Sequence, residues 1–179
     1  MRAAETAAFD RGSTAETLMD EAAAGIADAV SIFFPAPGRC VVFAGKGNNG
    51  SDAIAAAELL QQRGWSIELR LAFPEAECGE LSRKKLASLR AALQPGRSRG
   101  GPTILFDGLL GVGATPPLRE PIRSACREIN RLRRDEHAFV FAADLPSGID
   151  SDSGVADSEC VVADFTLAIG FAKRGLVAD

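Results

Sequence analysis

Three polar, glycine-rich segments hold most of the side chains in this sequence that could do chemistry. They are GKGNNGSD at 45–52, DGLLGVGAT at 107–115 and DLPSGID at 144–150. Within them, Asn49, Asp107 and Ser147 could offer oxygen ligands without an imidazole or a thiolate. Oxygen-only sites suit hard cations rather than zinc or copper. One carboxylate among neutral oxygens suits a weakly charged ion better than a tight calcium cage.

The first segment also matches G-x-G-x-x-G, the pattern of dinucleotide-binding proteins, and an acidic residue, Glu68, follows it. Its glycines permit positive φ angles and close backbone approach, and the N-terminus of the next helix can receive a phosphate. The paired asparagines and Asp52 add polarity that a loop packed against pyrophosphate does not require. A phosphate-binding loop and an ordinary tight turn therefore both stay open, and an NAD-dependent dehydrogenase would lack a placed histidine or tyrosine for hydride transfer.

Two of the segments begin with a carboxylate, Asp107 or Asp144, directly after an apolar run. A carboxylate at the end of a buried strand is costly unless it is paired or bound to a cation. The alternative for Asp107 is that it caps nearby backbone amides. Ligands of parallel α/β sheets bind beyond the carboxyl ends of the strands, so we expect the three segments to meet in one crevice.

The elements that must position these segments alternate along the chain. Short apolar runs, typical of strands buried on both faces, cover 40–45, 103–108, 138–144 and 163–170, and a further strand-like run covers 65–71. Helix-like patterns cover 14–33, 51–63, 81–93 and 120–134. This alternation predicts a doubly wound α/β sheet with helices on both faces. No linker or internal repeat interrupts it, so we expect one domain spanning residues 1–179.

Composition excludes several classes of function. The chain has 179 residues, of which 46% are hydrophobic, and a formal net charge of −4, which argues against a nucleic-acid or anionic-membrane binder. The single histidine, His137, excludes a two-histidine metal site, and there is no tyrosine. The four cysteines form no C-x-x-C motif and are expected to be buried, reduced thiols. Without a signal peptide or an apolar membrane span, we expect a cytoplasmic protein.

Four motifs follow one another along the chain: AGKGNNGSDAIAAAELL, ILFDGLLGVG, FAADLPSGIDSDSG and ADFTLAIGFAKRGL. In this order and spacing they resemble the motifs of the YjeF N-terminal domain family, the NAD(P)H-hydrate epimerases. The preceding AFDRGSTAETLMDEAAAGIA resembles the family's N-terminal helices, so the resemblance runs from about residue 8 to residue 176. It implies a Rossmann-like three-layer α/β/α sandwich with a mostly parallel sheet. It also implies an isomerase of nicotinamide nucleotide repair, which interconverts the R and S hydrates of NADH and NADPH (NADHX and NADPHX).

The resemblance assigns site residues motif by motif. It implies that substrate binds to Asn48, Asn49, Gly50, Ser51, Asp52, Gly111, Val112, Gly113, Ala114, Thr115, Pro116, Pro117 and Asp144. It also implies a potassium ion held by Asn49, Asp107 and Ser147, the oxygen set named above. Inverting the hydrated carbon calls for a proton donor and acceptor beside the nicotinamide ring. We expect Asp144 to be this catalytic group, because burial raises the pKa of a strand-end carboxylate, with Asp52 as the alternative.

Two positions depart from the family's usual loop, which reads N-N-G-G-D-G where this chain has N-N-G-S-D-A. If Ser51 or Ala53 must adopt a positive φ, the strain would be about 1 kcal/mol or more. The alternative function is therefore a catalytically inactive nucleotide- or protein-binding module with the same fold. Lys173, in the FAKRGL segment, is either a positive charge near a phosphate or a solvated lysine.

The resemblance also implies partners. Family members suggest a homodimer, and the alanine-rich face of helix 14–33 could form part of its contact. They also suggest a functional link with an ADP- or ATP-dependent NAD(P)H-hydrate dehydratase, fused or separate. We expect no nucleic-acid partner and no membrane partner.

Overall fold

The structure is a computed structural model that describes residues 11–92 and 100–177. Its elements are α2 (Ala15–Phe33), β1 (Arg39–Ala44), α3 (Asn48–Gln62), β2 (Ser66–Leu71), the 3-10 helix η1 (Glu75–Glu77), α4 (Glu80–Ala92), β3 (Thr103–Gly108), α5 (Ile122–Asp135), β4 (Phe139–Ala143), β5 (Phe165–Leu167) and the 3-10 helix η2 (Arg174–Leu176). This order confirms the predicted alternation of helices and strands. Residue 93 of the predicted helix 81–93 and residues 8–10 of the N-terminal motif lie outside the described residues.

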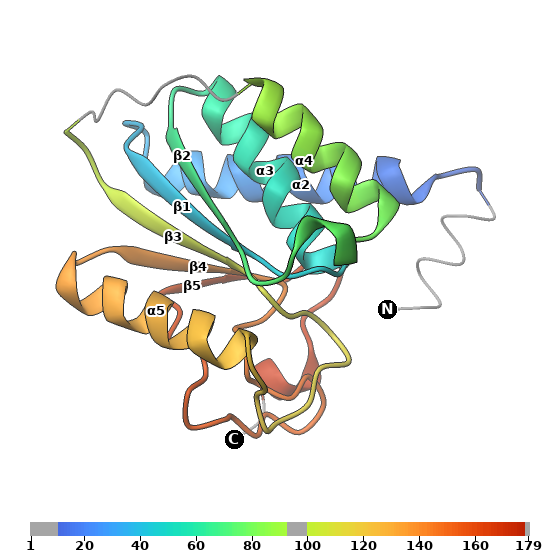
Figure 1. Cartoon of the computed structure of the whole chain (residues 1–179), viewed down its shortest axis with the longest axis vertical. Helices are drawn as coiled ribbons and strands as arrows, with labels where there is room; N and C mark the ends of the chain where they lie inside the picture. The colour runs from blue at the N-terminus through green and yellow to red at the C-terminus, as the bar shows by residue number, and fades with distance from the viewer. Residues whose placement is uncertain (1–10, 93–99, 178–179) are drawn as a thin grey trace.

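Within the described residues, five strands form one parallel sheet in the order β2-β1-β3-β4-β5 (Figure 1). The chain adds β2 on one side of β1 and then crosses to the other side of β1 to begin β3. The direction in which successive strands are added to the sheet therefore reverses between β1 and β3. In doubly wound sheets, ligands bind at such a switch point. Phe43 of β1 lies opposite Asp107 of β3, and Asp107 lies opposite Ala142 of β4. The carboxyl ends of these three strands thus lie side by side.

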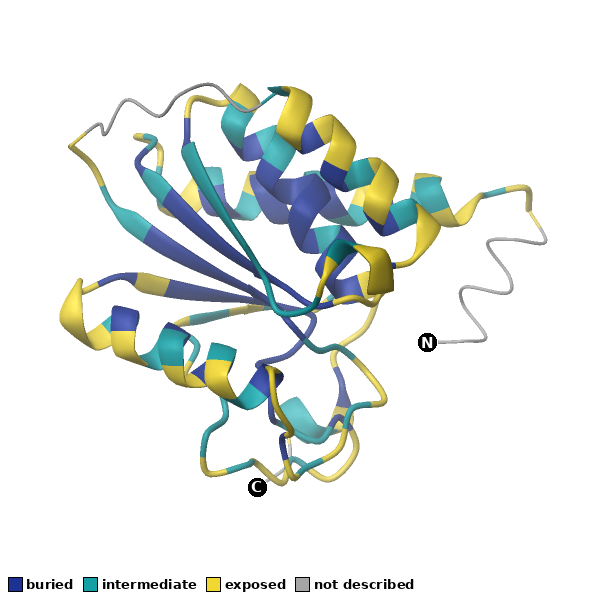
Figure 2. Cartoon of the chain, in the orientation of Figure 1, coloured by how far each residue is buried: buried dark blue, intermediate teal, exposed yellow. Residues whose placement is uncertain are grey.

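Helices cover both faces of the sheet, which confirms the Rossmann-like three-layer α/β/α sandwich (Figure 1). On one face, α2, α3 and α4 pack on strand side chains such as Val42 and Phe106. On the other face, α5 packs on side chains such as Val41 and Leu105. Alternate residues of a strand point to opposite faces, so a strand covered on both sides must be apolar throughout. The central strands are accordingly buried along most of their length (Figure 2).

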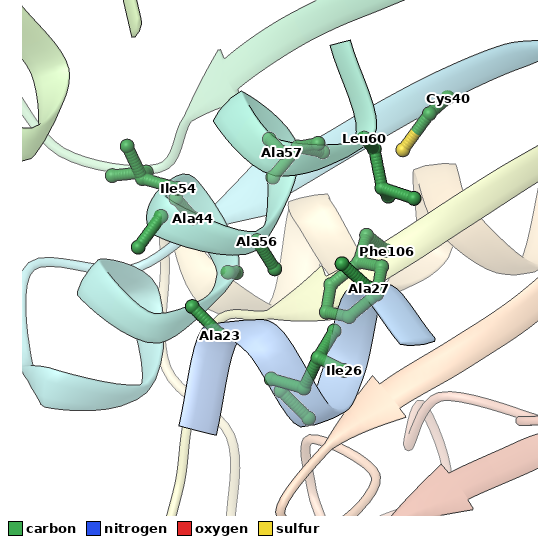
Figure 3. Close-up of a cluster of buried hydrophobic side chains, with 14 of the residues drawn as sticks. Ala23, Ile26, Ala27, Cys40, Ala44, Ile54, Ala56, Ala57, Leu60 and Phe106 are labelled. Atoms are coloured by element: carbon green, nitrogen blue, oxygen red, sulfur yellow. The ribbon is translucent and has the colours of Figure 1, made fainter. Parts of the chain in front are cut away.

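Small side chains let α2 and α3 approach each other closely (Figure 3). Ala23 and Ala27 of α2, and Ala56 and Ala57 of α3, are at most 1% exposed and belong to one cluster with Phe106 of β3. Because the interior is close-packed, a larger side chain at any of these positions would push the helices apart. Ala23 and Ala27 of the alanine-rich face of α2 are therefore used inside the protein and are not exposed for a dimer contact.

Most boundaries agree with the expectation within two residues, but the start of α3 and the end of β5 each differ by three. Helix α3 begins at Asn48 rather than at residue 51, so the paired asparagines form its first turn instead of a loop before it. Strand β5 spans Phe165–Leu167 rather than 163–170, because it pairs only with β4, and β4 ends at Ala143, opposite Leu167. A polar first turn carries no apolar periodicity, and an apolar run continues past the point where pairing stops. The sequence pattern therefore does not mark either boundary.

The cysteines are free thiols, as expected from their spacing. Cys40, Cys78 and Cys126 are buried, and Cys160 is half-buried. Burial raises the pKa of the Cys40 and Cys126 thiols well above their usual range, so these side chains behave as small hydrophobic groups. Among the helices that the structure describes, none combines the length and the apolar character needed to cross a membrane.

Candidate functional site

Glycines allow the ends of β1 and β3 to meet the first turn of α3. A Cβ atom at Gly45 would lie 2.0 Å from the carbonyl oxygen of Leu109, and one at Gly50 would lie 2.1 Å from the carbonyl oxygen of Gly45. Side chains do not approach backbone oxygens so closely, so both positions require glycine. Gly47, the N-cap of α3, would meet no described atom within 4 Å. Two glycines of the G-x-G-x-x-G pattern thus serve packing, and the third leaves space in front of the helix.

The predicted substrate segment 48–52 forms the first turn of α3. The first N–H groups of a helix have no carbonyl partners within it, and together with the helix dipole they attract anions. Asn48 is exposed, whereas Asn49, Gly50 and Ser51 are buried and Asp52 is half-buried. The turn therefore offers backbone amides at the switch point while most of its side chains point inward.

The departures from the family loop are accommodated without strain. Ser51 and Ala53 both lie in α3, and neither has a positive φ. The Ser51 hydroxyl donates to the Gly47 carbonyl oxygen at 3.3 Å and is hydrogen-bonded to the hydroxyl of Ser82 in α4. The Ser51 side chain is 1% exposed and thus joins α3 to α4. If Ser51 contacts substrate as predicted, it does so through its backbone.

Asp107, at the end of β3, is fully buried and accepts three hydrogen bonds. Its Oδ1 accepts from the Ser147 hydroxyl at 2.7 Å and from the Leu109 N–H at 3.2 Å, and its Oδ2 accepts from the Ser147 N–H at 2.8 Å. Burial raises the pKa of Asp107 to about 6 in spite of these bonds. All three donors are neutral. At neutral pH the carboxylate therefore carries a buried negative charge that no cationic side chain among the described residues balances.

Asn49 joins this group through Leu110. The Asn49 Nδ2 donates to the Leu110 carbonyl oxygen at 2.7 Å, and the Leu110 N–H donates to the Ser147 hydroxyl at 2.9 Å. The amide oxygen of Asn49, Oδ1, is buried and has no hydrogen-bond partner among the described residues. A Cβ at Gly111 would lie 3.6 Å from this oxygen, so glycine keeps the space beside it open. The three predicted ion ligands, Asn49, Asp107 and Ser147, thus lie in one hydrogen-bonded group.

The sequence did not predict that the backbone of Leu110 takes part in this group. Its carbonyl oxygen and its N–H connect Asn49 to Ser147, while its apolar side chain gives no sign of this role. The neighbouring Gly111 was the available signal, because glycine beside a strand end marks close approach of the backbone to another group.

Asp144 follows β4 in a left-handed conformation, with a φ of 70°, which is uncommon for a residue with a side chain. It is buried, and its Oδ1 accepts from the Ile169 N–H at 3.2 Å and from the ammonium group of Lys173. Lys173 Nζ also donates to the Ile169 carbonyl oxygen at 2.8 Å. Lys173 is itself buried. The expectation of a solvated lysine is therefore wrong, and its charge faces Asp144.

Asp52 is the second carboxylate of this region. Burial, and then the negative charge of Asp144, raise the pKa of Asp52 to about 7. The two carboxylates come from different elements, since Asp52 belongs to α3 and Asp144 follows β4. The charge of one predicted candidate for the proton-transfer group, Asp144, thus affects the pKa of the other, Asp52.

A hollow of about 170 Å³ opens beside Lys173. It is lined by Val112, Ser151, Asp152, Phe171, Ala172, Lys173 and Arg174. Val112 and Phe171 are exposed apolar side chains there. Of the predicted substrate segment 111–117, Gly111 lies against Asn49 and Val112 lines the hollow. Residues 113–117 continue as a loop whose residues are exposed or half-buried.

A second hollow, of about 310 Å³, lies at the amino end of β4. It is lined by Arg133, Arg134, His137, Ala138, Phe139 and Asp164. Arg133 is already paired with Asp164 in this hollow. Ligands of doubly wound sheets bind at the opposite, carboxyl ends of the strands, so this hollow is not part of the candidate site.

An open, doubly wound α/β protein with a buried polar site at its switch point is the class that this fold and site define. The family model described as "YjeF-related protein N-terminus" matches residues 15–175. The chain belongs to this family, which confirms the resemblance inferred from its four motifs.

Several curated relatives match most of the chain. The NAD(P)H-hydrate epimerase of Cenarchaeum symbiosum is 34% identical over 173 residues, which cover 92% of this chain and 74% of the relative. The NAD(P)H-hydrate epimerase of Limosilactobacillus fermentum is 29% identical over 167 residues, covering 90% and 78%. The bifunctional NAD(P)H-hydrate repair enzyme of Archaeoglobus fulgidus is 38% identical, but this chain spans only 33% of its length.

The fold is also similar to a solved structure. The crystal structure of yeast ynu0 superposes with a TM-score of 0.81 over 98% of this chain and 80% of that chain. The two sequences are 21% identical, so this likeness supports the three-layer fold alone.

Proposed function

We propose that this protein is an NAD(P)H-hydrate epimerase, an isomerase acting on NADHX and NADPHX. Relatives that it matches over most of their length carry this name. The observation that carries the proposal is a pair of carboxylates at the switch point: Asp144 is buried and bound to Lys173, and burial, together with the charge of Asp144, raises the pKa of Asp52 to about 7. Two such groups suit a reaction in which a proton is given and taken.

Substrate binding is proposed for segments 48–52 and 111–117 and for Asp144. The substrate contains a diphosphate, and the first turn of α3 offers N–H donors and the positive end of a helix dipole to such a group. The space in front of Gly47 supports this position. The exposed apolar side chains of Val112 and Phe171 suit a planar ring. An anionic dinucleotide held in this way requires no basic surface.

Epimerisation inverts the hydrated carbon of the nicotinamide ring. Whether the hydroxyl leaves and returns or the ring opens and closes, a proton must be given and taken beside that carbon. In Asp144, Oδ1 is bonded by Lys173 and Ile169, while Oδ2 has no partner among the described residues and is available to substrate. Asp52, whose pKa is raised to about 7, can hold a proton near neutral pH. We therefore assign Asp144 as the catalytic residue and Asp52 as its partner in proton transfer.

Potassium is the proposed cofactor, held by Asn49, Asp107 and Ser147 together with the Leu110 carbonyl oxygen. Two features support it among the described residues: Asn49 Oδ1 is a buried oxygen without a partner, and Asp107 is a buried charge without a counter-ion. Each is unfavourable alone, and a weakly charged cation with oxygen ligands would remove both. When bound, the ion would supply positive charge that holds the loops after β3 and β4 together.

A homodimer in the cytoplasm completes the proposal. Ile32 and Phe33, at the end of α2, are exposed and offer an apolar contact surface. The four free cysteines suit a reducing compartment. Relatives named as bifunctional repair enzymes support a functional link with an ADP- or ATP-dependent NAD(P)H-hydrate dehydratase, fused or separate. The mass of the protein in solution, measured by light scattering, tests the dimer.

The function is tested by mixing purified protein with the S hydrate of NADH and following the R hydrate by chromatography. We expect conversion faster than the spontaneous rate, and faster in potassium chloride than in sodium chloride at equal ionic strength. Asp144→Asn should lower the rate strongly but leave it measurably above the spontaneous one, because substrate binding is retained. Asp135→Asn, which changes an aspartate in an exposed ion pair with Arg131, is the matched control and should keep the wild-type rate. Conversion at the spontaneous rate at every protein concentration would refute the function.

The alternative, a catalytically inactive nucleotide- or protein-binding module, depends on Ser51 and Ala53. Both residues fit into α3 without a positive φ, so this reason for expecting inactivity does not hold. The same assay separates the two functions, because a binding module would bind the hydrate without accelerating its conversion.

A further inference from the structure

Lys173 forms a buried ion pair with the proposed catalytic residue, Asp144. Its side chain is 7% exposed, and that of its partner Asp144 is 5% exposed. Taking an ammonium group and a carboxylate out of water is unfavourable, and replacing such a pair by apolar side chains is often neutral or stabilising. Stability alone is therefore a weak explanation for this ion pair.

The contacts of Lys173 define the orientation of one carboxylate. Nζ donates to Asp144 Oδ1 and to the Ile169 carbonyl oxygen, and the Ile169 N–H donates to the same Oδ1. One oxygen of Asp144 is thus held by two donors, whereas Oδ2 has no hydrogen-bond partner among the described residues. The carboxylate is therefore fixed with one oxygen bonded and the other available.

The backbone of Asp144 is constrained at the same place. Its φ of 70° lies in the left-handed region, and its N–H donates to the Leu167 carbonyl oxygen at 2.9 Å. A residue with a side chain keeps such a conformation only where surrounding contacts determine it. Lys173 supplies one of these contacts and also lines the hollow next to Val112. Lys173 therefore borders open space that a substrate could occupy.

We infer that Lys173 is a positioning residue of the proposed epimerase, which holds Asp144 Oδ1 so that Oδ2 faces the substrate as the proton-transfer oxygen. The inference rests on the proposed function. Lys173 acts through Asp144 and transfers no atom itself.

The test compares Lys173→Met, Lys173→Arg and a control, Lys84→Met, in the NADHX assay. Lys84 is an exposed lysine paired with Glu16, so its substitution removes one ion pair outside the site and should leave kcat unchanged. We expect Lys173→Met to lower kcat by about 100-fold or more, the scale of a misplaced acid–base group. KM should stay within about twofold of the wild type, because the lysine does not bind substrate directly. Lys173→Arg keeps the charge and should recover part of kcat.

A double variant tests whether Lys173 acts through Asp144. Lys173→Met in an Asp144→Asn background should lower kcat no further than Asp144→Asn alone, because residues that act as a unit are not additive. Independent structural damage would instead multiply the two losses. The double variant also removes both charges of the pair together, so neither is left buried alone, and circular dichroism establishes its fold before the kinetics.

The outcomes separate the inference from the function. If the wild type accelerates epimerisation and Lys173→Met keeps its kcat, or loses activity only through a higher KM, the positioning role is wrong and the function stands. If the two single losses multiply in the double variant, the positioning role is also wrong. If the wild type itself does not accelerate the reaction, the proposed function fails and the inference fails with it.

Discussion

The Ser147 hydroxyl joins the loops that follow β3 and β4, so Ser147→Ala should lower the free energy of unfolding. The hydroxyl donates to Asp107 Oδ1 at 2.7 Å and accepts from the Leu110 N–H at 2.9 Å. Ser147 is 1% exposed, so water does not take the place of the missing oxygen. The substitution therefore removes one bond from a buried carboxylate and leaves the N–H of the half-buried Leu110 without its acceptor.

The size of the effect follows from these two contacts. A hydrogen bond to a charged group contributes about 1.5–3 kcal/mol, and a buried donor without an acceptor costs about 1–3 kcal/mol. We expect a loss of about 3–5 kcal/mol at pH 8, where Asp107, with a pKa raised to about 6 by burial, is ionised. Urea unfolding measures the loss, and an unchanged slope would show that the unfolding transition itself is unaltered.

Ser51→Ala is the matched control for this measurement. Ser51 is also 1% exposed, but its hydroxyl bonds only neutral partners, the Gly47 carbonyl oxygen and the Ser82 hydroxyl. We expect its substitution to cost about 1–2 kcal/mol. If Ser147→Ala costs no more than Ser51→Ala, the reasoning about the buried charge of Asp107 is wrong.

The same pair of proteins tests the proposed ion. A ligand that binds only the folded state raises its stability, so exchanging sodium for potassium should raise the thermal midpoint of the wild type. Ser147→Ala removes a proposed ligand and should abolish this rise, whereas Ser51→Ala should keep it. An equal response of both variants would contradict an ion bound at this group.

Three further substitutions test other parts of the site. Asp52→Asn removes a carboxylate that holds its proton to higher pH in the folded than in the unfolded state, because burial and Asp144 raise its pKa to about 7. The free energy of unfolding of the wild type, relative to that of this variant, should therefore fall by up to about 4 kcal/mol between about pH 4 and pH 7. Urea unfolding measures this difference, and a difference that does not change with pH would contradict the raised pKa. Gly50→Ala places a Cβ 2.1 Å from the Gly45 carbonyl oxygen; we expect a loss of about 2 kcal/mol or more, or insoluble protein, and an unchanged midpoint would contradict the packing. Ser51→Gly restores the family's usual loop residue but should lower the thermal midpoint, because glycine weakens a helix by about 1 kcal/mol and the bond to Ser82 is lost. The chromatographic assay should then show no gain in kcat, and a clear gain would revive the argument that the serine hinders turnover.

The parallel sheet could be predicted because its strands are covered on both faces. The apolar runs 40–45, 103–108 and 138–144 correspond to β1, β3 and β4 within a residue or two. Parallel strands align their carboxyl ends, so the meeting of the polar segments at one edge follows from the same pattern. The grouping of Asn49, Asp107 and Ser147 was predictable for this reason, from residue type and position at strand ends.

The remaining features depend on contacts that no local pattern encodes. The direction of the Ser51 side chain depends on Ser82, which α4 brings against α3. The role of Leu110 belongs to its backbone, which any residue could supply. The pairing of Lys173 with Asp144 depends on the path of the chain after β5, which returns past the end of β4. Sequence reasoning could select Lys173 as unusual, but only the fold brings it to a partner.

Asp107 and Asp144 share one sequence pattern and yet meet different requirements. Asp107 lies at the end of β3 and Asp144 directly follows β4, and each is at most 3% exposed, so each needs compensation for its buried charge. Asp107 receives only neutral donors from the described residues, which leaves a net negative charge that a bound cation would balance. Asp144 receives a full positive charge from Lys173 through one oxygen, which leaves its second oxygen available for chemistry. The partner of each carboxylate, rather than its place at a strand end, therefore distinguishes the proposed ion ligand, Asp107, from the proposed proton-transfer group, Asp144.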